Sequence, residues 1–129
     1  MNFWEYQIKA IETAIYPNVN NNLEYPTLGL CGEAGEVANI IKKIQRDDHG
    51  LLSIAKRQEL YSELGDVLWY LAAICNELGV TLEDIANHNI AKLDERRKSN
   101  EIKKHENYAR SFKVKDGSNG GAALQYGGG

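Results

Sequence analysis

The sequence predicts an all-α protein, and three observations carry that prediction. Apolar residues recur every three or four positions over most of residues 2–97, which is the period of an amphipathic helix. Helix-capping residues stand at the starts of these segments, and turn-forming residues separate them. The alternation typical of a strand is weak and confined to residues 111–114. A chain of 129 residues is long enough to bury the core of one domain.

The first helix is expected to begin after Asn2 and to end before Pro17. Asn2 is a suitable N-cap, and Glu5 stands three positions later, as in a capping box. Its apolar side chains share one face at spacings of three and four: Trp4, Ile8, Ile11 and Ile15. We expect this face, including the Trp4 indole, to be buried in the core.

The second and third helices are expected to form an antiparallel pair. The second opens at Pro26, with Thr27 as its cap, and fades into the polar residues 45–50. The third begins after Ser53 and ends at Gly79, a typical C-terminal stop. The connection between them is short, which favours antiparallel packing.

A fourth helix is expected from residue 82, opened by Thr81, with residues 98–106 as a polar extension or frayed end. We place the helical domain at residues 1–110 and a glycine-rich, flexible tail at residues 111–129. Cys31 and Cys75 both fall within apolar helical patterns, so we expect both to be small core residues. The predicted fold is a bundle of four or five antiparallel helices.

Two acidic pairs of equal spacing are the main candidates for chemistry. Glu33 and Glu36 form one pair, and Glu63 and Asp66 form the other. Each pair is spaced i, i+3 on a helix. Glu33 lies within the apolar stripe of its helix and Glu63 borders that of the next, while Glu36 and Asp66 each lie about 60° further round, so both pairs turn toward the side that their helices bury. Four converging carboxylates would repel one another unless a cation lay between them. Oxygen ligands of this kind suit a divalent metal such as Mg²⁺.

Gly35 and Gly65 stand inside the two acidic pairs. Each costs up to about 1 kcal/mol relative to alanine within a helix. Close approach of the two helices, or of a ligand, is one reason to accept that cost. The alternative is that both pairs are ordinary surface acids on a non-catalytic helical interaction module.

Charge and composition exclude several classes of function. The net charge of −3 gives no general attraction to nucleic acid or to a membrane. The N-terminus has no basic and apolar leader, and no apolar run is long enough to span a bilayer. With two cysteines and no leader, a reducing cytoplasm is the expected location. A di-iron carboxylate bundle is disfavoured because no histidine follows a glutamate by three positions.

The sequence resembles the MazG-like nucleotide pyrophosphohydrolases of the all-α NTP pyrophosphohydrolase superfamily. Residues 25–38, YPTLGLCGEAGEVA, resemble the first family motif in its phage-type variant, and residues 63–70, ELGDVLWY, resemble the second. The resemblance covers roughly residues 1–97. It implies hydrolysis of a nucleoside triphosphate to the monophosphate and pyrophosphate, with Mg²⁺ as cofactor and Mn²⁺ as a substitute.

The resemblance also assigns roles to individual residues. Its metal-binding positions correspond to Glu33, Glu36, Glu63 and Asp66, and either Glu33 or Glu36 is the expected general base. The segment NIAKLDER resembles a later family motif and places Asn89, Lys92 and Arg96 on one helix face that suits a ribose and a triphosphate. Lys43 is either a solvated helix-end residue or a phosphate ligand. Trp69 and Trp4 are each a core residue or a stacking partner of the base.

The family resemblance implies that subunits pack together to complete the bundle and the site. We therefore expect a homodimer or a dimer of dimers. The expected partners are a nucleoside triphosphate and further copies of the chain. For a phage-encoded protein, the place of action would be the host cytoplasm.

Overall fold

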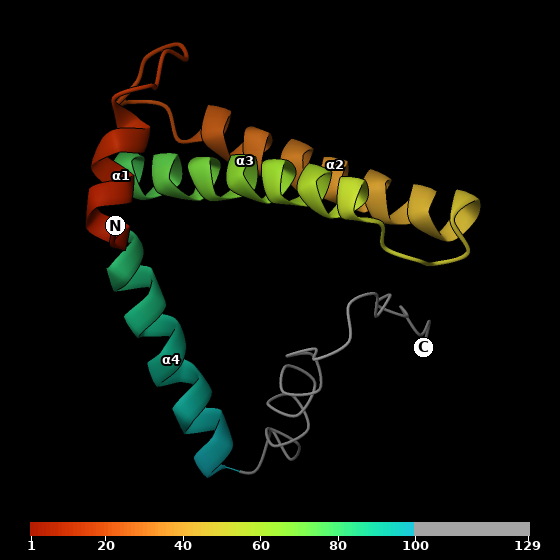
Figure 1. Ribbon diagram of the computed structural model, residues 1–129. Helices are drawn as coiled ribbons and strands as arrows, with labels where there is room; N and C mark the ends of the chain where they lie inside the picture. The colour runs from red at the N-terminus through yellow and green to blue at the C-terminus, as the bar shows by residue number, and fades with distance from the viewer. Residues whose placement is uncertain (100–129) are drawn as a thin grey trace.

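The computed structural model describes residues 1–99, and these residues fold into four helices without a strand. Helix α1 spans Phe3–Ile11, α2 spans Glu24–Asp47, α3 spans Ile54–Leu78 and α4 spans Leu82–Lys98 (Figure 1). The all-α class is therefore confirmed. The expected extension at residues 100–106, the weak strand pattern and the glycine-rich tail lie outside the described residues.

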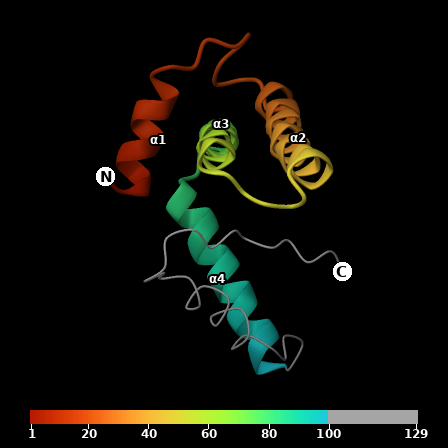
Figure 2. The same ribbon diagram turned by 45° about the vertical axis from the view of Figure 1, so that its right-hand side comes forward.

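Helix α3 is the central element of the fold. Helices α2 and α3 lie side by side and antiparallel along most of their lengths, whereas α1 packs against the other side of α3 (Figures 1 and 2). Helix α4 leaves the end of α3 and runs away from the α2–α3 pair (Figure 1). One core cluster joins α1, α3 and α4 and the other joins α2 and α3; their buried members are Ala10, Ala72, Cys75 and Leu82 in the first, and Ile40, Ile44 and Leu60 in the second.

Three helix starts and one helix end follow the local sequence signals. Asn2, Ser53 and Thr81 are the N-caps of α1, α3 and α4, and each side chain accepts a hydrogen bond from the backbone three residues on. The Asp84 carboxylate accepts a hydrogen bond from the Thr81 backbone amide (2.9 Å), which completes a capping box. Gly79 ends α3 in the left-handed conformation, with a φ of 68°.

The prediction that the apolar face of α1 is buried in the core is wrong. Trp4 and Ile8 are 54% and 44% exposed, and the side chains that α1 buries are those of Gln7 and Ala10. The helix packs on its small Ala10 side, which lets the Trp69 indole N–H reach the Ala10 carbonyl (3.2 Å) and the Thr13 hydroxyl (2.8 Å). An apolar stripe cannot by itself show which partner helix comes close enough to cover it.

Two helix boundaries also differ from expectation. Helix α1 ends at Ile11, because the amides of Thr13 and Ala14 bond to carbonyls three residues back rather than four, and Ile15 is left outside the helix and exposed. Helix α2 begins at Glu24, three residues before the expected cap. The Asn22 side chain accepts from the Tyr25 amide (3.0 Å), and the Thr27 hydroxyl donates to the Leu23 carbonyl within the helix (2.8 Å). Cys75 is buried as expected, but Cys31 is exposed, so its expected core position is wrong.

A buried glutamine joins α1 to the corner between α3 and α4. The Gln7 side-chain N–H donates to the Val80 carbonyl (3.0 Å), and its side-chain oxygen accepts from the Leu82 amide (2.9 Å). These two backbone groups lie where α3 has ended and α4 has not yet closed its first turn, so neither helix can satisfy them. Gln7 therefore fixes the direction in which α4 leaves the fold.

The loop between α1 and α2 is held by the carboxylate of Glu77, near the end of α3. That carboxylate accepts hydrogen bonds from the Tyr16 hydroxyl and from the backbone amides of Asn20 and Asn22. Burial alone would raise the pKa of Glu77, but these donors outweigh it and hold the pKa below its ordinary value. The loop is therefore attached most strongly when Glu77 is ionised.

The attachment of this loop is expected to weaken in acid. A carboxyl with a depressed pKa stabilises the fold above its ordinary pKa of about 4.5, and this contribution is lost as the pH falls through the lower, folded value. Amide hydrogen exchange at Asn20 and Asn22 should therefore accelerate as the pH is lowered through this window, after correction for intrinsic rates. Glu77→Gln should remove the pH dependence, while Glu12→Gln, at an exposed carboxylate at the end of α1, should retain it. Equal protection in wild type and Glu77→Gln would contradict the role of the carboxylate.

Many large apolar side chains remain exposed on the described part of the chain. Each of the four helices contributes some of them: Phe3, Trp4, Ile8, Leu28, Ile54, Tyr61, Leu64, Leu71, Leu78, Ile85 and Ile90. Contiguous exposed apolar surface on a small protein commonly marks an interaction site. None of the four helices is long and apolar enough to cross a bilayer.

Candidate metal centre between helices α2 and α3

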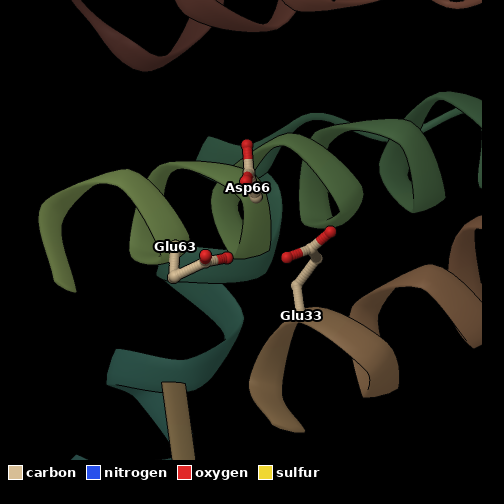
Figure 3. A group of neighbouring side chains, drawn as sticks. All are labelled: Glu33, Glu63 and Asp66. Atoms are coloured by element: carbon tan, nitrogen blue, oxygen red, sulfur yellow. The ribbon is translucent and has the colours of Figure 1, made fainter. Parts of the chain in front are cut away.

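Three carboxylates meet in the space between α2 and α3. Glu33 comes from α2, and Glu63 and Asp66 come from one turn of α3 (Figure 3). One oxygen of each side chain lies within 4.8 Å of the others. Glu33 and Glu63 are partly buried and Asp66 is exposed, so the group lies at the surface edge of the helix pair. We refer to Glu33, Glu63 and Asp66 as the carboxylate triad.

The triad follows from the antiparallel pairing of α2 and α3. Residues three apart on a helix are neighbours on one side of it, so Glu63 and Asp66 point toward the same region. The pairing of the two helices places Glu33, on α2, opposite that pair (Figure 3). The sequence therefore places the two α3 acids together locally, and the tertiary fold supplies the third.

Like charge accumulates at the triad. The pKa of Glu33 is raised by burial first, then by a hydrogen bond shared with Glu63, and then by the charges of Asp66, Glu63 and Glu36. The ion pairs found within residues 1–99 involve none of these carboxylates. The triad thus carries a concentration of negative charge that no side chain of the described chain neutralises.

The donor set of the triad suits a hard divalent cation. Carboxylate oxygens are the protein ligands that Mg²⁺ and Mn²⁺ prefer, and Mg²⁺ usually takes only a few of them and fills its other positions with water or phosphate oxygens. Three converging carboxylates at an open edge fit that pattern. The residues present therefore fit the metal that the family resemblance implies.

Glu36 lies beside the triad rather than within it. It borders a polar hollow of about 480 Å³ between α2 and α3, together with Lys43 and the triad residue Glu63. Glu36 follows Glu33 by three residues, so it lies about 60° round the helix from Glu33, toward the surface. Four carboxylates were expected to converge, but three do so, and the fourth is among the residues that line the adjoining hollow. We call this space the polar hollow; Gln58 and Ser62 of α3 also line it.

Two tyrosines near the triad were not among the residues expected from the sequence. The pKa of Tyr6 is raised by burial and by the charge of Asp66. The pKa of Tyr70 is raised by burial and then by Tyr25, Glu33 and Asp66. Tyr70 follows Asp66 by one helical turn, a spacing that could have identified it. Tyr6 comes from α1, and no local signal in the sequence connects it to the triad.

Gly29 of α2 lies against the Tyr70 ring of α3, and this contact requires a residue without a side chain. A Cβ atom built on Gly29 would collide with the Tyr70 ring, so the ring packs directly on the backbone of α2. At Gly32, Gly35 and Gly65 nothing lies within 4 Å of such an atom. The expected close approach of helices at Gly35 and Gly65 is therefore wrong for this helix pair, and approach of a ligand remains a hypothesis.

Substitution of Gly29 by alanine is expected to destabilise the protein. Overpacking against the Tyr70 ring costs about 1–3 kcal/mol, and the better helix propensity of alanine returns up to about 1 kcal/mol. Gly32→Ala is the matched control on the same helix, and it should stabilise by up to about 1 kcal/mol. Denaturant unfolding of both variants measures the difference. Adding Tyr70→Leu to Gly29→Ala should recover the loss, and a Gly29→Ala variant as stable as Gly32→Ala would contradict this packing.

The remaining candidate residues lie away from the triad or are engaged elsewhere. Asn89, Lys92 and Arg96 are exposed on α4, which packs against α1 and α3 but not against α2. Within one chain they are not brought to the triad or to the polar hollow. The Trp69 ring is partly buried, its N–H is bound to α1, and Tyr16 and Tyr70 pack edge-on against it. Lys43, by contrast, lies at the polar hollow.

The fold and the site together define an all-α protein with a carboxylate triad suited to a divalent metal between two antiparallel helices. Residues 22–100 match the MazG nucleotide pyrophosphohydrolase domain. The chain therefore belongs to the MazG nucleotide pyrophosphohydrolase family. It is also similar to the gene 37 protein of Mycobacterium phage L5, with 46% identity over 97 residues that cover 71% of this chain and 85% of the phage protein. No solved structure matches the chain.

Proposed function

We propose that this protein is a Mg²⁺-dependent pyrophosphohydrolase that cleaves ribo- or deoxyribonucleoside triphosphates to monophosphates and pyrophosphate. The observation that carries the proposal is the carboxylate triad, which lies within the family match and has no neutralising side chain among residues 1–99. Cleavage would occur at the bond between the α- and β-phosphates. A role in controlling the cytoplasmic nucleotide pool would follow.

In this proposal the triad holds Mg²⁺, with Mn²⁺ as a substitute. A bound cation of this kind neutralises phosphate charge and lowers the pKa of a water molecule that attacks phosphorus. Glu33, Glu63 and Asp66 would supply the protein ligands. Glu36 is outside this group and borders the polar hollow, which favours Glu36 over Glu33 as the acceptor of the proton from water.

The polar hollow suits the leaving pyrophosphate. Lys43 can offer its ammonium to the β- and γ-phosphate oxygens, and Gln58 and Ser62 offer neutral hydrogen-bond donors. The hollow also contains Glu36, Glu59 and Glu63, so an anion is expected to enter it only together with divalent cations. This requirement links binding of the triphosphate to binding of the metal.

Assembly into a homodimer or a dimer of dimers is part of the same proposal. The exposed apolar faces of α1, α3 and α4 offer the surface for such contacts. The face of α4 with Asn89, Lys92 and Arg96 is remote from α2 in its own chain, so it would act on a triphosphate bound by another copy. Light scattering after size exclusion measures the mass, and a monomer at micromolar concentration would contradict this part.

The test of activity is a panel of all NTPs and dNTPs incubated with the protein and Mg²⁺, with release of pyrophosphate as the readout. Turnover that stops with a chelator and returns with Mg²⁺ or Mn²⁺ is the expected result. If a folded protein turns over no nucleotide and its melting temperature does not respond to Mg²⁺, the acids belong to a non-catalytic interaction module instead.

A further inference from the structure

We propose that Glu77 is a positioning residue for the proposed metal site: it ties the start of α2 to the end of α3, and this tie holds Glu33 within the carboxylate triad. The inference rests on the proposed function, because it concerns the affinity of that same site for its cation. We use the name loop clamp for the Glu77 carboxylate and its three donors, which are the Tyr16 hydroxyl and the backbone amides of Asn20 and Asn22.

Neither core cluster of the fold holds the first half of α2. In the described part of the chain, the side chains that α2 contributes to these clusters begin at Val37, four residues after Glu33. Before Glu33, the buried side chain of α2 is that of Pro26. The Tyr70 ring of α3 touches α2 at Gly29, where the helix has no side chain that could interlock with it. The first half of α2 therefore needs a further attachment to stay beside α3.

Repulsion between the triad carboxylates acts against the pairing of the helices at this point. One oxygen of each carboxylate lies within 4.8 Å of the others, and the ion pairs of the described residues involve none of the three. Like charges at this separation repel, and the repulsion falls as the helices move apart. The core cluster of Ile40, Ile44 and Leu60 resists such movement on one side of the triad. On the other side a separate contact has to do so.

The loop clamp supplies that contact. Because α2 and α3 are antiparallel, the end of α3 lies beside the start of α2 (Figure 1). The Asn22 amide donates to the Glu77 carboxylate (3.1 Å), and the Asn22 side-chain oxygen accepts from the Tyr25 amide in the first turn of α2 (3.0 Å). Asn22 thus links the last turn of α3 directly to the first turn of α2.

The buried ring of Tyr16 forms a second link between the same two helices. It stacks on Tyr25 of α2, with 5.1 Å between the ring centroids, and packs edge-on against Trp69 of α3 at 6.4 Å. Its hydroxyl donates to Glu77, which fixes the ring in this place. Loss of the Glu77 carboxylate would therefore weaken both links at once.

The position of Glu33 between two attachments explains why the loop clamp should affect the cation. Tyr25 precedes Glu33 by about 12 Å along the helix axis, and Val37 follows it by about 6 Å. Without the clamp, α2 can pivot about the core cluster and carry Glu33 away from α3. A cation with ligands on both helices then binds only the fraction of molecules in which the helices are together, so its apparent affinity falls.

The test measures Mn²⁺ binding by electron paramagnetic resonance, without nucleotide. Glu77→Ala should weaken binding by roughly threefold to thirtyfold, the range expected for a residue that acts through others. Tyr16→Phe, which keeps the ring and removes only the hydroxyl, should weaken it in the same direction by less. Leu82→Ala is the matched control, because Leu82 is buried in the core cluster that contains no residue of α2. It should lower the melting temperature and keep the wild-type affinity.

A double-mutant cycle separates positioning from a general loss of stability. If Glu77 acts by placing Glu33, then Glu77→Ala added to Glu33→Gln should weaken the remaining Mn²⁺ binding by no more than about twofold. An equal loss with and without Glu33 would overturn the positioning role. Circular dichroism and light scattering check that the variants keep the fold and the mass of the wild type.

The outcomes distinguish this inference from the proposed function. Weaker Mn²⁺ binding in Glu77→Ala, with Leu82→Ala unaffected, would support the inference even if the wild type hydrolysed no nucleotide, in which case the proposed function alone would fail. Wild-type affinity in both Glu77→Ala and Tyr16→Phe, or an equal loss in Leu82→Ala, would overturn the inference and leave the proposed function standing. A wild type that binds no Mn²⁺ would overturn both.

Discussion

Replacement of Glu33 by glutamine is expected to reduce nucleotide hydrolysis by more than about a hundredfold, because losing a direct metal ligand should cost more than the roughly 10–100-fold loss typical of a residue that only orients a ligand. Glu33 is the α2 member of the carboxylate triad, and a neutral amide there removes one of the three converging charges. Release of pyrophosphate at saturating Mg²⁺ measures the change. Glu24→Gln, at an exposed carboxylate in the first turn of the same helix, should keep wild-type activity.

The same substitution is expected to raise stability in metal-free buffer. Glu33 has a raised pKa, so its folded form binds a proton more tightly than the unfolded chain does. The contribution of Glu33 to the stability of the fold is full below its ordinary pKa of about 4.5, and it is lost as the pH rises through the pKa of the folded state. With a chelator present, Glu33→Gln should therefore melt above the wild type at neutral pH. Mg²⁺ should raise the melting temperature of the wild type more than that of the variant. A lower melting temperature for the metal-free variant would mean that Glu33 is needed to hold the fold together.

Replacement of Gln7 by methionine is expected to be the most destabilising of the single substitutions outside the site. Methionine keeps the length of the side chain but leaves the Val80 carbonyl and the Leu82 amide without their partners. Each buried polar group left unpaired costs about 1–3 kcal/mol, so the total loss is expected at about 2–5 kcal/mol. Denaturant unfolding measures it.

Gln45→Met is the control for this substitution, because Gln45 is exposed on α2 and forms no side-chain hydrogen bond to the described residues. It should change stability by less than about 0.5 kcal/mol. Equal stability of the two variants would show that water can replace Gln7 as the hydrogen-bond partner of the Val80 carbonyl and the Leu82 amide. Circular dichroism would also show whether Gln7→Met keeps the helical content of α4.

Features of the fold set by neighbours in sequence were predictable. The caps at Asn2, Ser53 and Thr81 and the stop at Gly79 depend on residues within one helical turn. For the same reason the sequence places Glu63 and Asp66 together. The short connection between α2 and α3 made their antiparallel pairing predictable, and that pairing brings Glu33 to the other two acids.

Features set by contacts between distant segments could not be predicted in this way. Gln7 looks like a polar surface residue until the corner around Val80 is formed, 73 residues later. Trp4 lies on a regular apolar stripe, but α1 packs on its Ala10 side, where the Trp69 indole N–H reaches the Ala10 carbonyl. At the start of α2 the Tyr25 amide donates to the side chain of Asn22, a residue that precedes the expected start by several positions.

The packing of Tyr70 on Gly29 bears on which cation the proposed metal site would prefer. Gly29 lies one turn before Glu33 on α2, and Tyr70 lies one turn after Asp66 on α3, so the ring acts as a spacer between the helices next to the triad. The thickness of that spacer sets the distance across which the carboxylates must reach. Mg²⁺ binds oxygen at about 2.0–2.1 Å and Ca²⁺ at about 2.3–2.6 Å. If the triad binds a cation as proposed, a thinner or thicker side chain at this contact is expected to change the ionic radius that the triad accepts, although the contact itself contains no ligand.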